Sequence, residues 1–256
     1  MLPFERLRAL ARYVGDDTTL VLEAADCLAE FTTDPTQLVT VCRRLVAHHP
    51  SCGPLWWLCA RVLSAPDPET AARAAARELS ADRSADRLAA LLPFPHDDPI
   101  AVVGSSDIVT AALQERPDLD TFAVDLATDN GTSRPLRYGD PRPLEARAAV
   151  ERAPSHCLIP VCAMSPTIAL VPEGAGGLLD RLGKCKLWLV APTGHLLPES
   201  LFSAVRTRTL DAAPGPAVEA LELQRADRVA GPRGLERIEQ LAARVDCPAV
   251  PELLRS

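Results

Sequence analysis

A change in hydrophobic period near residue 100 constrains the fold of this chain more than any other feature of its sequence. The run Ile100–Val103 is short and continuously apolar, which is typical of a strand buried on both faces of a parallel sheet. The turn Gly104-Ser105-Ser106 follows it, and a helical pattern with Ile108 and Ala112 comes next. A strand, a glycine-containing turn and a helix in this order predict an α/β unit that begins here.

The rest of the chain repeats this alternation. Further strands are expected at Thr121–Leu126, Cys157–Ala163 and Lys186–Ala191, with a weaker pattern at Ile168–Val171. Helical patterns lie between or after them, at 144–152, 176–183 and 199–206. Alternating strands and helices predict a parallel, doubly wound sheet, which is a Rossmann-like architecture.

The residues before this unit have the period of helices. Asp34-Pro35 predicts a helix start, because aspartate caps a helix and proline suits its first position. Trp56-Trp57 is interpreted as part of the helical core, with a binding surface as the alternative. The segment 93–99 (PFPHDDP) is proline-rich and has no apolar period, so it marks a boundary. We therefore expect a helical N-terminal domain over residues 1–95 and a Rossmann-like α/β domain over residues 96–256.

Charge and apolar content exclude several classes of protein. The net charge is −7 and the pI is about 5.3, so nucleic acid is not an expected partner, because phosphate backbones require a clustered basic face. No stretch approaches the roughly 20 apolar residues that span a bilayer. The first residues, MLPFERLRALARY, lack the apolar core of a signal peptide. The sequence therefore predicts a cytoplasmic protein without a membrane segment.

The eight cysteines are expected to be free thiols, because a chain of this length without an export signal rarely depends on disulfides. The group closest to a metal site is His48, His49, Cys52 and Cys59, but its spacing fits no standard zinc pattern. Cys59 also falls on the apolar stripe of a helix, where a small buried thiol is usual. We expect neither a metal nor a cofactor.

Ligands of open parallel sheets bind at the carboxyl ends of the strands, and this rule selects the turn Gly104-Ser105-Ser106 first. A glycine, two hydroxyl groups and a helix N-terminus could hold a phosphate through backbone N–H groups and the helix dipole. The alternative is that Ser106 or Asp107 only caps the following helix.

Two further loops are candidates by the same rule. Gly174, Gly176 and Gly177 precede a helix and permit close approach of a ligand, although tight turns also use such glycines. They do not form a dinucleotide fingerprint after the first strand. His195 follows the strand Lys186–Ala191 and could act as an acid, a base or an anion contact, or be an ordinary loop histidine.

A set of segments between about residues 45 and 235 follows the order of motifs in one known family. The matching segments are His49-Pro50-Ser51, Ile100–Leu113, Cys162-Ala163-Met164, Gly176-Gly177, Lys186–Ala191 and Arg225–Gly234. Together they resemble the translation initiation factor 2B α/β/δ family, which includes methylthioribose-1-phosphate and ribose-1,5-bisphosphate isomerases. The resemblance implies a helical domain followed by a Rossmann-like domain, and a homodimer.

The residues that would carry isomerase chemistry differ at the matching positions. The resembled isomerases use a cysteine in the turn after the first strand and the aspartate of a Gly-Ala-Asp motif. Ser105 or Ser106 stands at the first position and Met164 at the second, while an alternative alignment puts Gly176 at the second. His49 replaces an arginine that contacts phosphate. Isomerising an aldose phosphate requires an acid/base pair of suitable pKa, which serine and methionine do not supply.

The sequence therefore predicts a non-catalytic, initiation factor 2B-like protein that acts in regulation and binds a sugar phosphate or nucleotide at the strand ends. The candidate ligand-binding residues are Gly104, Ser105, Ser106, Gly174, Gly176, Gly177, His195 and His49. Two alternatives remain open. One is a sugar-phosphate isomerase with His195, Cys162 or Asp125 as substitute groups, and the other is a protein-interaction module that acts through the helical half.

Overall fold

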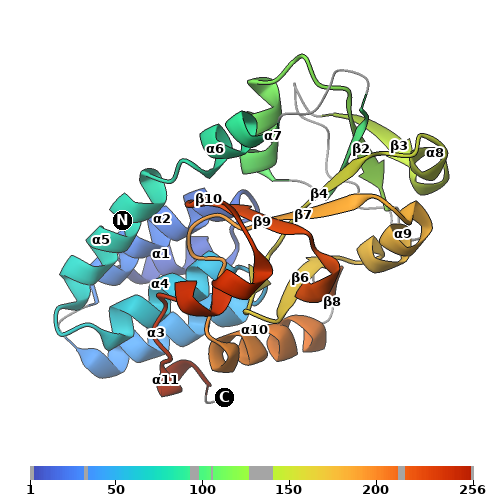
Figure 1. The fold of residues 1–256 in the computed structure, drawn as a ribbon. Coiled ribbons are helices and arrows are strands. Elements are labelled where there is room, and N and C mark those ends of the chain that lie inside the picture. The colour runs from blue at the N-terminus through green and yellow to red at the C-terminus, as the bar shows by residue number, and fades with distance from the viewer. Residues whose placement is uncertain are drawn as a thin grey trace.

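Among the residues that the structure describes, six helices precede the first strand, and Figure 1 shows them together on one side of the molecule. The structure is a computed structural model, and it describes residues 3–31, 34–92, 98–104, 106–126, 141–212 and 217–254. The six helices are α1 (Pro3–Ala11), α2 (Asp17–Ala29), α3 (Pro35–His48), α4 (Gly53–Ser64), α5 (Pro68–Ser80) and α6 (Ser84–Leu91). Helix α3 begins where the sequence predicts, because the Asp34 carboxylate accepts hydrogen bonds from the backbone N–H groups of Thr36 and Gln37.

In the described part of the chain, the larger of two sheets has seven strands in the order β10-β9-β7-β4-β1-β2-β3, all parallel except β10. Its strands are β1 (Ile100–Val103), β2 (Thr121–Asp125), β3 (Arg142–Glu145), β4 (His156–Pro160), β7 (Lys186–Val190), β9 (Arg228–Gly231) and β10 (Gly234–Glu236). The chain runs outward from β1 to β3 and returns to β4 on the other side of β1. The direction of winding therefore reverses between β1 and β4, which is where open sheets bind ligands.

Helices cover both faces of this sheet, as expected of a doubly wound fold. They are α7 (Asp107–Gln114), α8 (Ala146–Glu151) and α9 (Ala175–Leu182), together with α6 from the first half of the chain. Ile100 and Val102 pack with apolar residues of α6 and α7, whereas Ala101 and Val103 pack with those of α8 and α9. Alternate residues of one strand thus serve opposite layers, which explains why β1 is continuously apolar.

The expected strand Cys157–Ala163 is divided between two sheets, which corrects the prediction of a single strand. Strand β4 ends at Pro160, and Cys162 donates its backbone N–H to the carbonyl of Leu170 instead. A smaller antiparallel sheet follows, with the order β5-β6-β8. Its strands are β5 (Ala163–Met164), β6 (Ile168–Pro172) and β8 (Val218–Glu222). The weak pattern at Ile168–Val171 is therefore a strand, but it lies outside the parallel sheet.

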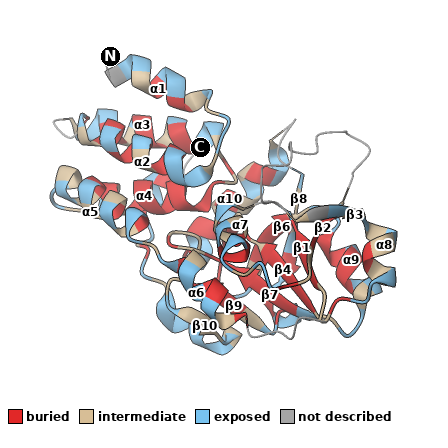
Figure 2. Cartoon of the chain, turned by 90° about the horizontal axis from the view of Figure 1, so that it is seen from above, coloured by how far each residue is buried: buried red, intermediate tan, exposed pale blue. Residues whose placement is uncertain are grey.

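The C-terminal part of the chain returns to the helical half. It consists of α10 (Glu199–Asp211), η1 (Leu223–Arg225), η2 (Ile238–Arg244) and α11 (Pro251–Leu254), with β8, β9 and β10 between them. Phe202 and Leu253 are fully buried in the same cluster as Trp56 of α4. Figure 2 shows the buried residues of the helical half on α2, α3 and α4. Both Trp56 and Trp57 are buried, so the prediction that they belong to the helical core is confirmed.

The hydrophobic cores cross the expected domain boundary. Leu88 of α6 packs against the sheet, whereas Phe202 of α10 packs among the N-terminal helices. A division into domains of residues 1–95 and 96–256 stays a prediction. Each of these two segments contributes a helix to the hydrophobic core of the other.

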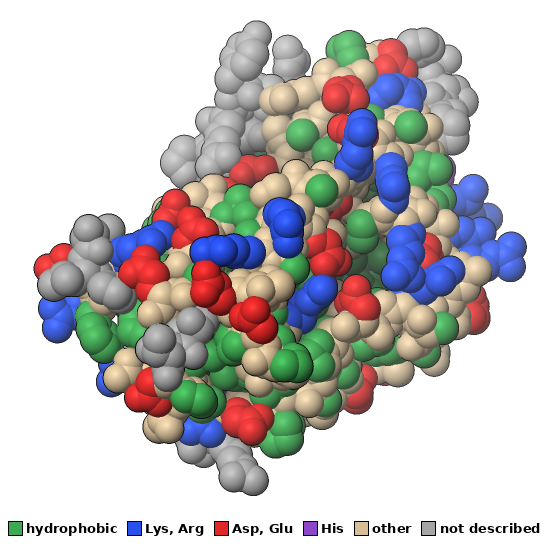
Figure 3. All heavy atoms as spheres, turned by 90° about the vertical axis from the view of Figure 1, so that its left-hand side faces the viewer, with side chains coloured by type: hydrophobic (Ala, Val, Ile, Leu, Met, Phe, Trp, Pro, Cys, Tyr) green, Lys and Arg blue, Asp and Glu red, His purple; other side chains and the backbone are tan. Residues whose placement is uncertain are grey.

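All eight cysteines are free thiols, and six of them are buried; only Cys162 and Cys185 are partly exposed. Among the described residues, no helix is long and apolar enough to cross a membrane. The face of the molecule on the left-hand side of Figure 1 carries basic side chains interspersed with acidic ones (Figure 3).

Candidate functional site

A cavity of about 410 Å³ lies at the carboxyl ends of β1, β4 and β7, where the winding of the sheet reverses. We call it the aspartate cavity. The sheet half contributes Ser106, Asp107, Ile108, Pro160, Val161, Cys162, Pro172, Val190, Pro192, Thr193 and His195, and the helical half contributes Gly15, Asp16, Asp17, Thr18, Pro54, Leu79, Ser80 and Asp82. Both halves of the molecule therefore build this cavity.

His195 presents a hydrogen-bond acceptor at the wall of the aspartate cavity. Its Nδ1 lies 3.0 Å from the carbonyl oxygen of Pro192 and 3.3 Å from that of Thr193. Carbonyl oxygens only accept, so Nδ1 carries the proton and donates it. Burial lowers the pKa of His195, although Asp17 opposes the shift. The ring is therefore neutral near pH 7, and its Nε2 is left as an acceptor.

Cys162 and Met164 do not supply an acid or a base near neutral pH. Burial, reinforced by the charge of Asp17, raises the pKa of the Cys162 thiol to about 12. The thiol is therefore protonated and unreactive as a nucleophile. Met164, the position that the resemblance matches to a catalytic aspartate, lies in β5 with its side chain fully buried.

Aspartates give the aspartate cavity its charge. Burial by itself would raise the pKa of Asp16. The hydrogen bonds that the Asp16 carboxylate accepts from Thr19 have the larger combined effect, so the pKa of Asp16 is lowered. Asp17 follows at the first position of α2, and Asp107 occupies the first position of α7. No lysine or arginine lies among the described residues that line this cavity. An anion placed here would meet carboxylates rather than cations.

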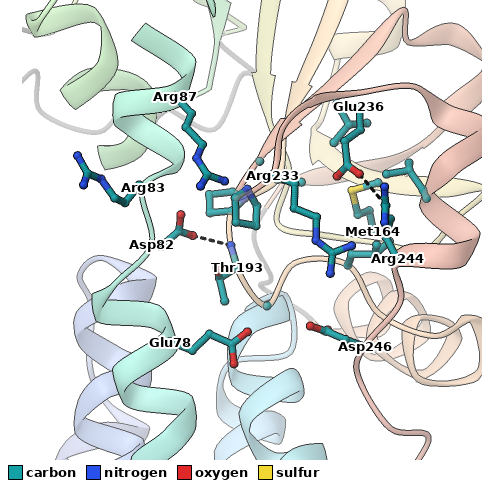
Figure 4. Close-up of a pocket in the computed structure, with 18 of the residues that line it drawn as sticks. Glu78, Asp82, Arg83, Arg87, Met164, Thr193, Arg233, Glu236, Arg244 and Asp246 are labelled. Carbon is teal, nitrogen blue, oxygen red and sulfur yellow. Dashed lines mark hydrogen bonds and ion pairs between the residues drawn. The ribbon is translucent and has the colours of Figure 1, made fainter. Parts of the chain in front are cut away.

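A second cavity, of about 400 Å³, adjoins the first at the carboxyl ends of β7 and β9 (Figure 4). We call it the arginine cavity, because four arginines line it: Arg83 just before α6, Arg87 of α6, Arg233 after β9 and Arg244 of η2. Acidic residues are present as well, namely Glu78, Asp82, Glu236 and Asp246. Asp82, Pro192 and Thr193 line both cavities, so the two cavities share a wall.

Most charges of the arginine cavity already have partners within the protein. Asp82 accepts hydrogen bonds from the backbone N–H groups of Thr193 and Ser84 and from the Ser84 hydroxyl, at 2.6–2.7 Å. The remaining pairs are Glu78 with Arg61, Glu236 with Arg244, and Asp86 with Arg83.

Arg87 and Arg233 differ from the other two arginines of the cavity. Within the part of the chain that the structure describes, neither makes an ion pair or a side-chain hydrogen bond. In Figure 4 the Arg87 side chain extends from α6 toward the loop that carries Thr193, and the Arg233 side chain extends from the β9–β10 turn toward Arg244 and Asp246. They are guanidinium groups available to an external anion.

Three of the predicted ligand-binding residues lie at the expected strand ends. Ser106 and His195 line the aspartate cavity together. Gly104 ends β1 with φ +87°, and a Cβ at this position would lie 2.7 Å from Cγ of Pro172, so the turn requires glycine. Ser105 lies outside the described residues.

The structure does not bring the other predicted residues to either cavity. Gly174, Gly176 and Gly177 lie at the start of α9, where the Gly176 N–H donates to the Glu219 carboxylate at 2.5 Å. The protein therefore already supplies an anion to this helix end. His49 ends α3, and its Nε2 lies 2.7 Å from the carbonyl oxygen of Leu10.

The substitute catalytic groups considered for an isomerase are only partly brought together. His195 and Cys162 line the same cavity, whereas Asp125 ends β2, is exposed and lines neither cavity. Among the described residues, no group of three or more His, Cys, Asp or Glu side chains is placed to hold a metal ion.

The arginine cavity was missed by sequence reasoning. Arg233 follows β9 at the carboxyl edge of the sheet, so the same strand-end rule would have selected it had β9 been expected. Strand β9 is short and begins with Arg228, so its apolar period is too weak to predict.

The fold, but not the sequence, is similar to known proteins. No family model and no curated protein matches the sequence. The structure is similar to eIF2B beta from Chaetomium thermophilum, with a TM-score of 0.66 and 13% identity over 98% of this chain and 92% of that one. It is also similar to a chain of the tetrameric eIF2B-beta2-delta2 complex from the same organism, with a TM-score of 0.69, 13% identity, and coverage of 94% and 92%.

An archaeal protein shows the same likeness. The translation initiation factor eIF-2B of Pyrococcus horikoshii OT3 matches with a TM-score of 0.67 and 13% identity, over 91% of this chain and 96% of that one. The expected architecture of a helical part and a Rossmann-like sheet is thereby confirmed, and the chain has an eIF2B-like fold.

Proposed function

We propose that this protein binds a phosphorylated small molecule at the carboxyl ends of its sheet and acts in regulation through binding rather than catalysis. The observation that carries the proposal is the pair Arg87 and Arg233, which face one cavity without ion-pair partners among the described residues. Guanidinium groups bind phosphate through paired, charge-assisted hydrogen bonds. A phosphate bound in this cavity would bring negative charge to two guanidinium groups that have no ion-pair partner among the described residues.

We assign the phosphate to the arginine cavity rather than to the turn Gly104–Ser106. A phosphate at Ser106 would enter the aspartate cavity, whose described lining contains carboxylates and no cation. Within one cavity a phosphate and these carboxylates would repel each other strongly, because water is partly excluded there. Ser106 and His195 would instead contact an uncharged part of the same ligand.

The absence of a suitable acid/base pair favours a binding role over an isomerase. Met164 cannot transfer a proton, and the Cys162 thiol, with its pKa raised to about 12, is a weak acid at neutral pH. One observation favours an isomerase as the second candidate. The neutral His195 ring lies in the same cavity as Cys162, and its Nε2 could accept a proton.

The solved structures of similar fold also suggest an oligomeric state for this chain. One of them is described as a tetrameric complex of two beta and two delta subunits. By analogy we propose that this chain forms a homodimer and acts in the cytoplasm. Size-exclusion chromatography with light scattering would test the dimer directly.

A thermal-shift screen of pentose phosphates and nucleotides tests the proposed function. A ligand present at 100 times its Kd should stabilise the protein by about 2.7 kcal/mol. Arg233→Ala should weaken binding of the stabilising compound by about tenfold or more, because it removes a charge-assisted contact. Arg181→Ala is the matched control, since Arg181 is exposed on α9 and lines neither cavity.

An activity measurement and the outcome of the screen together separate the alternatives. NMR detection of aldose-to-ketose conversion that His195→Ala abolishes would favour the isomerase. Failure of every phosphate to stabilise the protein would refute the proposed function and leave the interaction module, with its helical half as the binding part.

A further inference from the structure

Resting on the proposed function, we infer that the ligand carries a single phosphate and an unphosphorylated, hydroxyl-rich end, and that the aspartate cavity excludes a second phosphate. The inference concerns ligand selection at the same site. It makes Asp17 and His195 specificity-determining residues, and it predicts discrimination between a sugar monophosphate and the matching bisphosphate.

The position of the two cavities provides the first argument. Asp82, Pro192 and Thr193 line both of them. A phosphate held by Arg87 and Arg233 therefore lies beside the aspartate cavity, and the rest of a small sugar can reach over this shared wall. The carboxyl ends of β7 and β9 carry the arginine cavity, and those of β1 and β4 lead into the aspartate cavity.

Charge provides the second argument. Helices α2 and α7 both direct their N-termini toward the aspartate cavity, and such helix ends ordinarily attract anions. Here Asp16, Asp17 and Asp107 occupy the cap and first-turn positions. The Asp16 carboxylate also accepts the backbone N–H of Thr19 at 2.7 Å. The N-terminus of α2 thus already carries two carboxylates, and a second dianionic phosphate would meet them with no lysine or arginine among the described lining residues.

Hydrogen-bonding capacity provides an independent third argument. The Nδ1–H of His195 is used by the carbonyls of Pro192 and Thr193, so Nε2 faces a ligand only as an acceptor. Within the described structure, Nε2 has no hydrogen-bond partner. Ionised carboxylates are also acceptors only. Sugar hydroxyl groups can donate to these groups, whereas the oxygens of a phosphate dianion cannot.

Isothermal titration calorimetry with ribose 5-phosphate and ribose 1,5-bisphosphate tests the inference. The wild-type protein should bind the monophosphate about tenfold more tightly, which corresponds to the repulsion expected for charges near a partly buried site. Asp17→Asn removes one negative charge and keeps the side-chain shape, so it should reduce that preference at least about threefold. Asp26→Asn, an exposed position on the same helix that lines neither cavity, should leave it unchanged.

The outcomes separate the inference from the proposed function. Equal affinity for the two compounds, or a preference that Asp17→Asn does not reduce, would overturn the inference and leave the proposed function standing. Binding of neither compound, together with a null result for the remaining phosphates, would instead refute the proposed function. His195→Gln supplies a second variant. The glutamine amide N–H can donate to a second phosphate, so this variant should reduce the preference for the monophosphate over the bisphosphate although every carboxylate is still present.

Discussion

His195 shows how a single side chain sets the chemistry of the site. Two backbone carbonyls fix the proton on Nδ1, and burial keeps the ring neutral. Protonation of the ring in the folded state is therefore unfavourable. The unfolded chain, in contrast, binds that proton near the ordinary histidine pKa of about 6.5.

This difference predicts a pH dependence of stability. Because the folded-state pKa is lowered, the contribution of His195 to the free energy of unfolding is complete above about pH 6.5 and decreases as the pH falls from there toward the folded-state pKa. His195→Asn should make that decrease smaller. Urea denaturation at several pH values between about 5 and 8 measures it. His48→Asn, which replaces an exposed histidine, is measured alongside as a comparison. Identical slopes for wild type and His195→Asn would contradict the prediction.

The residue-level site could be predicted only in part. Ser106 and His195 follow strands with clear apolar runs, so the strand-end rule places them at one edge. Arg87 could not be predicted, because an arginine on an amphipathic helix has the pattern of a solvated face. Gly176 was expected to face a ligand, and only the three-dimensional structure shows Glu219 already bound to its N–H.

At the scale of elements, one carboxylate links the helical half to the sheet. Asp82 follows the end of α5, and it accepts hydrogen bonds from Ser84 at the start of α6 and from Thr193 after β7. The corner between two helices and the loop between two cavities are therefore held together by one side chain.

Asp82→Ala should destabilise the protein by about 2 kcal/mol, because it leaves buried donors of Ser84 and Thr193 without an acceptor. Asp86→Ala is the comparison. It removes an ion pair with Arg83 that is largely exposed, so its cost should stay below about 1 kcal/mol. Urea denaturation at neutral pH measures both variants. Equal costs for the two would contradict the role assigned to Asp82.

Element types were easier to predict than sheet membership. Ile100–Val103 and the Leu187–Val190 part of β7 are recognisable because both faces of each are covered and the apolar run is unbroken. Residues 163–172 also form strands, but they pair in a separate antiparallel sheet. The apolar content of such a segment predicts that it is buried. The strand with which it pairs depends on contacts with distant parts of the chain, which the local sequence pattern does not reveal.

At the scale of the whole molecule, the C-terminal helix α10 completes a core that the N-terminal helices begin. Phe202 is fully buried in that core, together with Leu201 and Val205. The helical half therefore depends on residues that lie about 150 positions further along the chain.

Phe202→Ala should destabilise the entire protein by about 3–5 kcal/mol, as expected for truncation of a buried aromatic ring. Leu210→Ala on the same helix should cost less than about 1 kcal/mol, because Leu210 is 54% exposed. Circular dichroism followed during urea denaturation should show one cooperative transition that shifts in Phe202→Ala. A shift confined to part of the signal would show that the two halves unfold independently.

The distribution of thiols has a practical consequence for these measurements. Six cysteines are buried and spread over both halves of the molecule, whereas only Cys162 and Cys185 are partly exposed. An alkylating reagent should therefore modify the native protein slowly at two positions at most, and the unfolded chain at all eight. Mass spectrometry after a short pulse of reagent would therefore measure the fraction of unfolded molecules without any introduced label. Peptide mapping of the modified cysteines would show which half of the molecule had unfolded.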